Sequence, residues 1–379
     1  MKKILVLLIL FIILIPNSTR ATDIAINEQL EGLNLGTFIS EGEKYTKETF
    51  PELDVGELIT KSLAGEVDNK LLYKILISLL GKEVVIGITT IGSILVIILV
   101  HSILKSICEN LGNDSVSKIA YFVEYILIIT IIMSSFSDTI VDIQETISNL
   151  VGFINTLVPI LIALITATGQ VATSTIIQPI LIFAIVFIGN IINIVVLPII
   201  TVAMVLTIVS NISDKIQLGN LAKFFKSSVT WFLGFVITIF VGILSLEGTL
   251  TSSVDGITIK GIKAATSTFI PVVGKALGDS VDTVLGATSL IKNSIGFVGI
   301  IIVIAICVAP IIKLTVLSVL YSLTSAISEP LADKKIVNII NQMSGVFKIL
   351  LGIVFFIAVL LIVGIALTLK ISNASLMYR

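Results

Sequence analysis

Titratable side chains inside apolar segments are the first candidates for chemistry in this sequence. The single histidine, His101, has Lys105 four residues further along, and Glu124 lies in the next apolar segment. Ionisable groups at membrane depth are uncommon and mark ion paths or proton relays, so these three side chains could form a polar cluster that lines a path. We favour a plainer interpretation, in which His101 and Lys105 extend to the cytoplasmic surface and Glu124 pairs with one of them.

Motifs for catalysis, cofactor binding or metal binding are absent from the sequence. There is no G-x-x-x-x-G-K-[ST] loop for a nucleotide and no H-E-x-x-H pair on a helix. Cys108 and Cys307 have no C-x-x-C spacing and no neighbouring histidine that could complete a zinc site, so we expect both to be buried thiols. Residues 146–213 contain no Asp, Glu, Lys, Arg or His. We therefore expect no catalytic residues, no cofactor and no metal site.

The composition indicates which elements must hold these side chains. Hydrophobic residues make up 56% of the 379 residues and charged residues 13%, whereas soluble domains average about 45–50% and about 25%. The mean hydropathy is +1.13. These values predict an all-α polytopic integral membrane protein in a lipid bilayer. The net charge of −1 offers no basic surface to phosphate groups, so we expect no nucleic-acid partner.

The N-terminal part of the chain has two regions. Residues 1–21 carry Lys2 and Lys3, then a twelve-residue apolar run and small residues up to Ala21. This pattern is typical of a secretory signal peptide, because a membrane span needs about 20 apolar residues. We expect cleavage near Ala21, and retention as an anchor is the alternative. Residues 22–83 alternate charged and apolar residues at near-helical spacing, which predicts amphipathic helices outside the cytoplasm.

Seven apolar segments follow, and loop charge indicates which of them cross the membrane. Cytoplasmic loops collect Lys and Arg. The lysine-rich stretches 215–226 and 334–348 can both be cytoplasmic only if 151–168 does not cross. We therefore predict six full spans plus two re-entrant or interfacial segments that contain proline, with seven to eight spans as the alternative. The apolar segments are 84–107, 119–136, 151–168, 176–209, 229–246, 295–327 and 346–369.

Matching prolines indicate an internal duplication. Pro159 and Pro271 lie 112 residues apart, and so do Pro198 and Pro310, the latter pair within the similar sequences VVLPII and CVAPII. Equal offsets between two proline pairs indicate two related halves. The predicted order is a first pair of transmembrane helices over 84–150, membrane repeats over 151–250 and 264–370, and a short C-terminal tail over 371–379.

The candidate re-entrant segments contain the residues that we expect to shape them. Residues 137–150 hold three acids and no base, so we expect an external loop, after which 151–168 enters the membrane and turns at an uncharged run. Backbone groups freed at such a turn must be buried in protein or reach a wet cavity. Prolines can also kink the long helices. The candidate turn or kink positions are Pro159, Gly169, Gln170, Pro179, Pro198, Pro271, Gly274 and Pro310.

Three stretches carry a resemblance to a known family. They are TLVPILIALITATGQVATSTIIQPILIF from 156, KFFKSSVTWFLGFVITIFVGILSLEG from 223 and FIPVVGKALGDSVDTVLGATSLIKNSIGFVG from 269. The chain resembles the stage III sporulation protein AE family of endospore-forming bacteria over nearly its whole length. The resemblance implies a component of the channel or secretion-like complex in the mother-cell membrane around the forespore, which supports late forespore development.

The resemblance also implies partners, and it leaves two other functions open. The implied partners are other stage III sporulation A-operon membrane proteins, indirectly a forespore membrane protein, and a separate ATPase, since the chain has no nucleotide motif. Repeats and broken helices would also suit a self-contained secondary transporter, although the first half lacks charge. A purely structural scaffold for the other channel proteins is the third interpretation.

Overall fold

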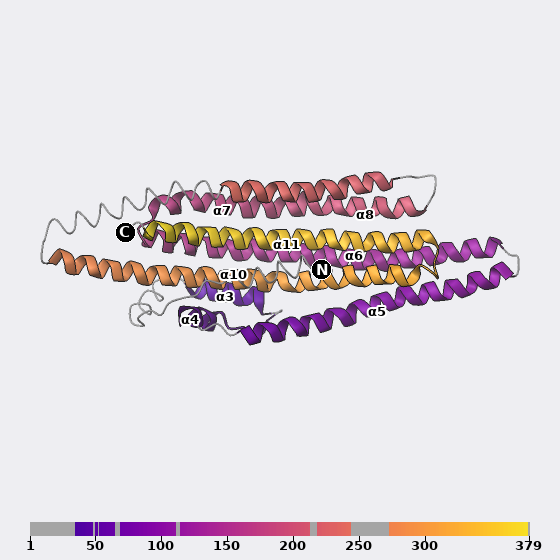
Figure 1. The fold of residues 1–379 in the computed structure, drawn as a ribbon, viewed down its shortest axis with the longest axis horizontal. Helices are drawn as coiled ribbons and strands as arrows, with labels where there is room; N and C mark the ends of the chain where they lie inside the picture. The colour runs from indigo at the N-terminus through magenta and orange to yellow at the C-terminus, as the bar shows by residue number, and fades with distance from the viewer. Residues whose placement is uncertain are drawn as a thin grey trace.

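The structure is a computed structural model, and it describes seven parts of the chain. Every regular element in these parts is a helix (Figure 1). The predicted signal peptide over 1–21 and Pro271 lie outside the described residues. The described parts are 35–47, 50–51, 53–64, 69–110, 114–212, 218–243 and 273–377.

Six helical stretches in the described residues are long and apolar enough to cross a membrane. This confirms the prediction of an all-α polytopic protein with six spans. Two short helices precede them, α3 (Leu35–Thr46) and α4 (Val55–Ala64). The elements that follow are α5 (Asn69–Asn110), α6 (Asp114–Ala167), α7 (Val171–Ile191), the π-helical segment η1 (Ile192–Val196), α8 (Leu197–Ile212), the helix Gly219–Ile243, α10 (Val273–Ser328) and α11 (Lys334–Met377).

The long helices lie side by side along one axis (Figure 1). In this view α6, α10 and α11 occupy the middle, with α7, α8 and the helix Gly219–Ile243 along one long side. The other long side holds α5 together with α3 and α4, which pack on α6 and α10. The bundle is therefore different on its two sides, because only one of them carries the two short N-terminal helices, which lie beside α5.

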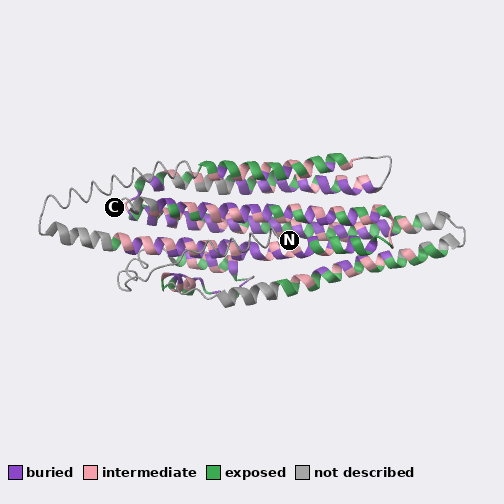
Figure 2. Ribbon diagram, viewed as in Figure 1, coloured by how far each residue is buried: buried purple, intermediate pink, exposed green. Residues whose placement is uncertain are grey.

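The core runs the length of the bundle along the central helices (Figure 2). On α10 the residues Ile291, Ile295, Val298 and Ile302 are all buried, at the spacing of one helix face. Helices in membranes approach closely where one of them carries a small residue. A Cβ added at Gly299 would come within 2.7 Å of the Leu157 side chain on α6. The backbone of α10 at Gly299 therefore packs directly against the Leu157 side chain.

The expected external loop over 137–150 is wrong, because α6 continues through it without a break. Phe136, Ile143, Ile147 and Leu150 are buried at helical spacing, while the acids lie on other faces. The stretch also contains no glycine or proline to end a helix. As a result 119–136 and 151–168 belong to one helix and count as one crossing. The segment 151–168 does not form a separate re-entrant element.

The second predicted re-entrant segment is also continuous with its neighbour. α10 begins at Val273, contains Gly274 in its first turn, and runs without interruption into the apolar stretch up to Ser328. The position that an offset of 112 residues pairs with Gln170 is Asp282, which lies inside α10, so the two halves differ here. The internal duplication stays a prediction. Most of the predicted tail is helical too, because α11 ends at Met377.

The prolines of the long helices are accommodated in different ways. Pro159, Pro179 and Pro310 lie inside α6, α7 and α10, which continue through them. Pro198 follows the five-residue π-helical segment η1, where the Leu197 amide donates to the Ile192 carbonyl five residues back. A proline cannot donate to the carbonyl four residues before it, and a π-helical turn is one local way to absorb this loss.

Candidate functional site

The turn between α6 and α7 is shaped by Gly169. Gly169 has a φ of 82°, and among the described residues no other backbone φ is positive. This left-handed conformation favours glycine. The Gly169 amide donates to the Thr166 carbonyl at 2.9 Å, and the Gln170 amide donates to the Ile165 carbonyl at 3.3 Å. This pair of bonds is the Schellman pattern that ends a helix. The chain therefore reverses at Gly169, within the uncharged run that the sequence indicates.

A buried polar network joins this turn to α10 and α11. Lys292 donates to Ser372 Oγ at 2.6 Å and to Asn373 Oδ1 at 2.9 Å. The Ser372 hydroxyl donates to Gln170 Oε1, and Asn373 Nδ2 donates to Asn293 Oδ1 at 3.2 Å. We call these five residues the turn level. It connects the end of the first uncharged half of the chain with both helices of the second half.

Lys292 is fully buried at the turn level, as are Gln170 and Ser372. Neutral oxygens accept its hydrogen bonds, and among the described residues no carboxylate forms an ion pair with it. A buried charge is tolerated only where hydrogen bonds replace its lost hydration. The Nε2 atom of Gln170 is buried without a hydrogen-bond partner in the described residues. The turn level is thus rich in donors, with little spare acceptor capacity.

A second polar level begins with the ion pair between Lys313 on α10 and Asp142 on α6. Beyond it, towards the α10–α11 turn, side chains of different helices form three more contacts. Lys226 Nζ donates to Thr207 Oγ1 at 3.1 Å, Asn338 Nδ2 donates to Asn211 Oδ1 at 2.8 Å, and Tyr125 Oη donates to the Ile208 carbonyl at 3.0 Å. We call the level of Asp142 and Lys313 the ion-pair level.

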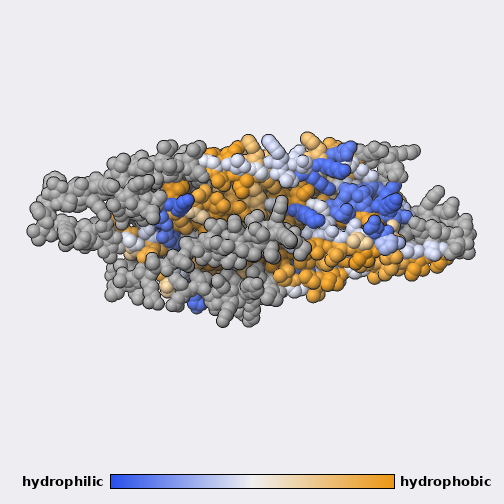
Figure 3. All heavy atoms as spheres, in the orientation of Figure 1, coloured by the Kyte–Doolittle hydropathy of each residue, from blue (hydrophilic) through white to orange (hydrophobic). Residues whose placement is uncertain are grey.

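The helices between the two levels carry no charge. No Asp, Glu, Lys, Arg or His occurs in 146–167 of α6, 293–312 of α10 or 349–369 of α11. The 20 residues 293–312 span about 30 Å at ~1.5 Å per residue, which matches the hydrocarbon core of a bilayer. Figure 3 shows hydrophobic surface between two zones of hydrophilic residues on the face in view. These uncharged stretches of α6, α10 and α11 therefore lie together between the turn level and the ion-pair level.

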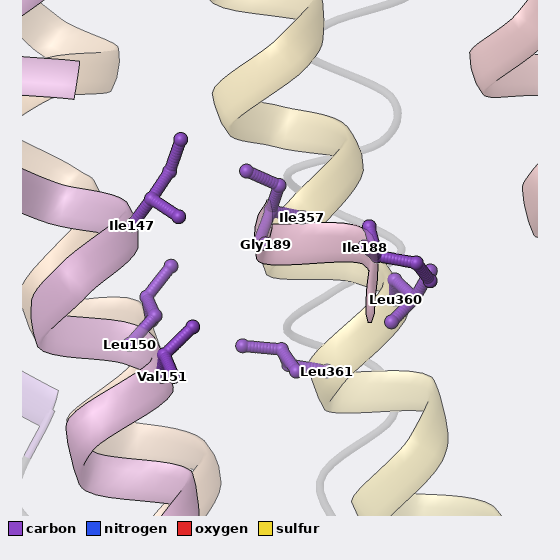
Figure 4. A pocket seen from close by; sticks show the side chains of 8 residues that line it. All are labelled: Ile147, Leu150, Val151, Ile188, Gly189, Ile357, Leu360 and Leu361. Atoms are coloured by element: carbon purple, nitrogen blue, oxygen red, sulfur yellow. The ribbon is translucent and has the colours of Figure 1, made fainter. Parts of the chain in front are cut away.

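The interior between the levels is tightly packed and apolar. Two small cavities of ≈ 10 Å³ lie there, each about the size that holds one water molecule. Side chains from three helices line the first one, as Figure 4 shows: Ile147, Leu150 and Val151 of α6, Ile188 and Gly189 of α7, and Ile357, Leu360 and Leu361 of α11. A cavity without polar groups gives ions and polar solutes no path.

The three charged residues that the sequence singled out are placed only in part. His101 and Lys105 belong to α5, but their side chains lie outside the described residues. Glu124 on α6 is 3% exposed, in the helix turn of Tyr121 and Tyr125. The cluster of His101, Lys105 and Glu124 therefore stays a prediction. Cys307 is a buried free thiol, as expected.

Sequence reasoning missed Lys292 because this residue lies between the predicted apolar segments 229–246 and 295–327. The helical phase could have revealed it. Lys292 lies four residues after the buried Thr288 and three before the buried Ile295, so it lies on the buried face of α10. Ser372 and Asn373 were missed because they were assigned to the tail.

Comparisons with known proteins find a family and a relative that are similar to this chain. A family described as stage III sporulation protein AE matches residues 53–372. The stage III sporulation protein AE of Bacillus subtilis (strain 168) is 28% identical over 306 residues, which cover 81% of this chain and 77% of that protein. No solved structure gives a significant match.

Proposed function

Because the chain belongs to the stage III sporulation protein AE family, we propose that it is a membrane component of the channel or secretion-like complex that joins mother cell and forespore during sporulation. It would reside in the mother-cell membrane around the forespore and support late forespore development. The observation that carries the proposal is the extent of the family match. Residues 53–372 include the six candidate spans and both polar levels, apart from Asn373, so the relationship concerns the membrane bundle.

The surface of the bundle supports assembly with other membrane proteins. The pair α5 and α6 extends beyond the α10–α11 turn (Figure 1), and its exposed side chains include Val85, Ile103, Ile119 and Phe122. Large exposed apolar surfaces mark protein or membrane contacts. The partners in this proposal are other stage III sporulation A-operon membrane proteins and, indirectly, a forespore membrane protein. A separate ATPase would supply energy, as the sequence contains no nucleotide-binding loop.

The orientation of the bundle follows from the charge rule. The turns at the α10–α11 end carry Lys334 and Lys335, and the preceding loop carries Lys215, so this end faces the cytoplasm of the mother cell. The α6–α7 turn at Gly169 is at the opposite end and would face the space between the two membranes. In this orientation the turn level lies on the side from which a forespore protein would be reached.

The proposal is tested by gene deletion and complementation in the endospore-forming organism that encodes the chain. Deletion should abolish a reporter of late forespore gene expression and the yield of heat-resistant spores, and the full-length chain supplied from a second locus should restore both. A fluorescent fusion should surround the engulfed forespore on the mother-cell side. Normal spore yield in the deletion strain, or a uniform signal over all cell membranes, would contradict the proposal.

A further inference from the structure

α6 carries an acidic face in the middle of an otherwise apolar helix. Along residues 134–148 its exposed side chains recur every three or four positions, while Ile143 on the opposite face is buried. The exposed set includes Asp138 and Glu145, and α6 contains no Lys or Arg after Lys118. No described residue forms an ion pair with either acid. We call the following residues the acidic strip: Ser134, Asp138, Val141 and Glu145.

α11 carries a lysine on a similar outward face. The side chains of Asn341 and Lys348 are exposed, whereas Met343 on the other face is buried. No described residue forms an ion pair with Lys348. A Cβ added at Gly345 or at Gly352 would meet nothing within 4 Å, so a neighbouring helix could approach the backbone closely here. We call the following residues the lysine strip: Asn341, Gly345, Lys348 and Gly352.

The two strips face away from each other. Ile147 and Leu150 of α6 and Ile357 and Leu361 of α11 line one cavity from its two sides (Figure 4). By helical phase, each strip lies on the opposite face of its helix from these cavity residues. The acidic strip and the lysine strip therefore point out of the bundle in different directions, and they cannot pair within one chain.

Two contacts fix the relative heights of the strips along the bundle. The Asp142–Lys313 ion pair sets position 142 of α6 level with position 313 of α10. Ser344 Oγ donates to the Ser318 carbonyl at 2.8 Å, which sets 344 of α11 level with 318 of α10. Position 313 lies five residues before 318, and α10 and α11 run in opposite directions. Position 349 is therefore level with 142, and α6 and α11 run in the same direction.

The strips match residue by residue at this height. The offset 349 − 142 = 207 sets Ser134 level with Asn341, Asp138 with Gly345, Val141 with Lys348, and Glu145 with Gly352. Lys348 is thus level with a position between the two acids, three and four residues from them, or about 4.5–6 Å at ~1.5 Å per residue. This distance is within reach of a lysine side chain. The two glycines are level with the acids and leave room for them.

We propose that the acidic strip of one copy packs against the lysine strip of a second copy, so that the chain assembles head to tail in the membrane. Copies of a membrane protein insert with one orientation, so strips at equal height in one bundle are at equal height in neighbouring bundles. This holds wherever the bilayer lies along the bundle. The inference goes beyond the proposed function, because it requires only a common orientation of the copies.

Charge also selects the symmetry of this contact. A two-fold axis through either strip would place acids against acids or lysine against lysine, and like charges in contact oppose association. Contact between unlike strips leaves one acidic strip and one lysine strip free on every dimer. Such a heterologous contact repeats, and it closes into a ring if the rotation between copies allows.

The test is disulfide formation between two differently tagged full-length chains produced in the same cells, both with Cys108 and Cys307 replaced by Ala. Ser134→Cys in one chain and Asn341→Cys in the other should give a product with both tags when the membranes are oxidised with copper phenanthroline. Ser134→Cys in both chains is the control for contact between like strips. Ser134→Cys with Gly352→Cys is the control for height, because these positions are about 16 Å out of level. Each control should give at least about tenfold less product, since a disulfide needs closely spaced Cβ atoms.

A single chain with both Ser134→Cys and Asn341→Cys distinguishes the two symmetries. A heterologous contact should give a ladder of dimers, trimers and larger products, because every copy keeps two different reactive strips. A two-fold contact stops at the dimer. A product that stops at the dimer would therefore overturn the head-to-tail arrangement.

A charge exchange tests the ion pairs themselves. Lys348→Glu in the chain with Asn341→Cys should lower the amount of mixed product at least about fivefold, because it places like charges in contact. Asp138→Lys with Glu145→Lys in the partner chain should then restore at least half of the product. Lack of any recovery would contradict the proposed pairing, since a general loss of folding cannot be reversed by a second change in another chain.

A link within one chain shows that each variant is folded. Asn211 and Asn338 share a hydrogen bond of 2.8 Å, so Asn211→Cys and Asn338→Cys in one chain should be joined by a short bismaleimide without any change in oligomer size. Absence of the mixed Ser134→Cys and Asn341→Cys product while this internal link forms would assign the strips to another partner and overturn the inference. None of these outcomes depends on spore formation, so failure here is distinct from failure of the proposed function.

Discussion

Lys292 is a charged side chain that neutral partners hold inside the bundle. Ser372 accepts one of its hydrogen bonds and donates a hydrogen bond to Gln170, so one hydroxyl joins α10, α11 and the α6–α7 turn. Removal of one partner from a buried polar group costs more than the bond itself, because the other partner stays desolvated. Among the turn-level residues, substitution of Ser372 should therefore lower the free energy of unfolding most.

Ser372→Ala should destabilise the purified protein by about 1–3 kcal/mol, because it leaves the Lys292 ammonium and the Gln170 carbonyl each without one partner. The measurement is thermal unfolding in a mild detergent. Lys292→Met should cost less, since it removes the buried charge along with its need for acceptors. Thr166→Ala is the control, as its hydroxyl bonds only to the Ile162 carbonyl of its own helix. A larger loss for Lys292→Met than for Ser372→Ala would contradict this account.

At the scale of elements, hydrophobic runs predicted the number of spans but not how they join. The run lengths and the lysine-rich stretches sufficed for six crossings. The helix α6 was cut in two because Asp138, Asp142 and Glu145 suggested a wet loop. Their helical phase was decisive instead: Ile143 and Ile147 face the core, and Asp142 pairs with Lys313, which is 171 residues away in sequence. No pattern local to α6 discloses that partner.

The single crossing of α6 fixes which turns share a side of the membrane. Val171, 58% exposed at the start of α7, should lie on the side opposite to Glu329 in the α10–α11 turn. With the native cysteines replaced, Glu329→Cys should react with an impermeant thiol reagent in inside-out vesicles and Val171→Cys in right-side-out vesicles. Reaction of both positions from the same side would mean that 151–168 does not continue the crossing begun at 119–136.

At the scale of the whole molecule, one chain provides two polar ends and a closed apolar middle. Between the levels the interior contains small cavities lined by side chains such as Leu150, Leu161 and Leu361. Helix packing of this density leaves no room for a hydrated ion. In the proposed function, an aqueous path would therefore run outside the single bundle.

The isolated chain should for this reason be impermeable. Reconstituted alone into sealed liposomes, it should release trapped carboxyfluorescein no faster than protein-free liposomes, because neither the apolar cavities nor the exposed apolar side chains of Trp231 and Phe235 offer water a route. Flotation of the liposomes confirms insertion, and a pore-forming peptide confirms that the dye can leave. The closed interior follows from side chains of α6, α7 and α11 that meet across long sequence distances, which hydropathy could not foretell. Dye release that rises with the amount of inserted protein would place the path inside one bundle and favour a self-contained transporter.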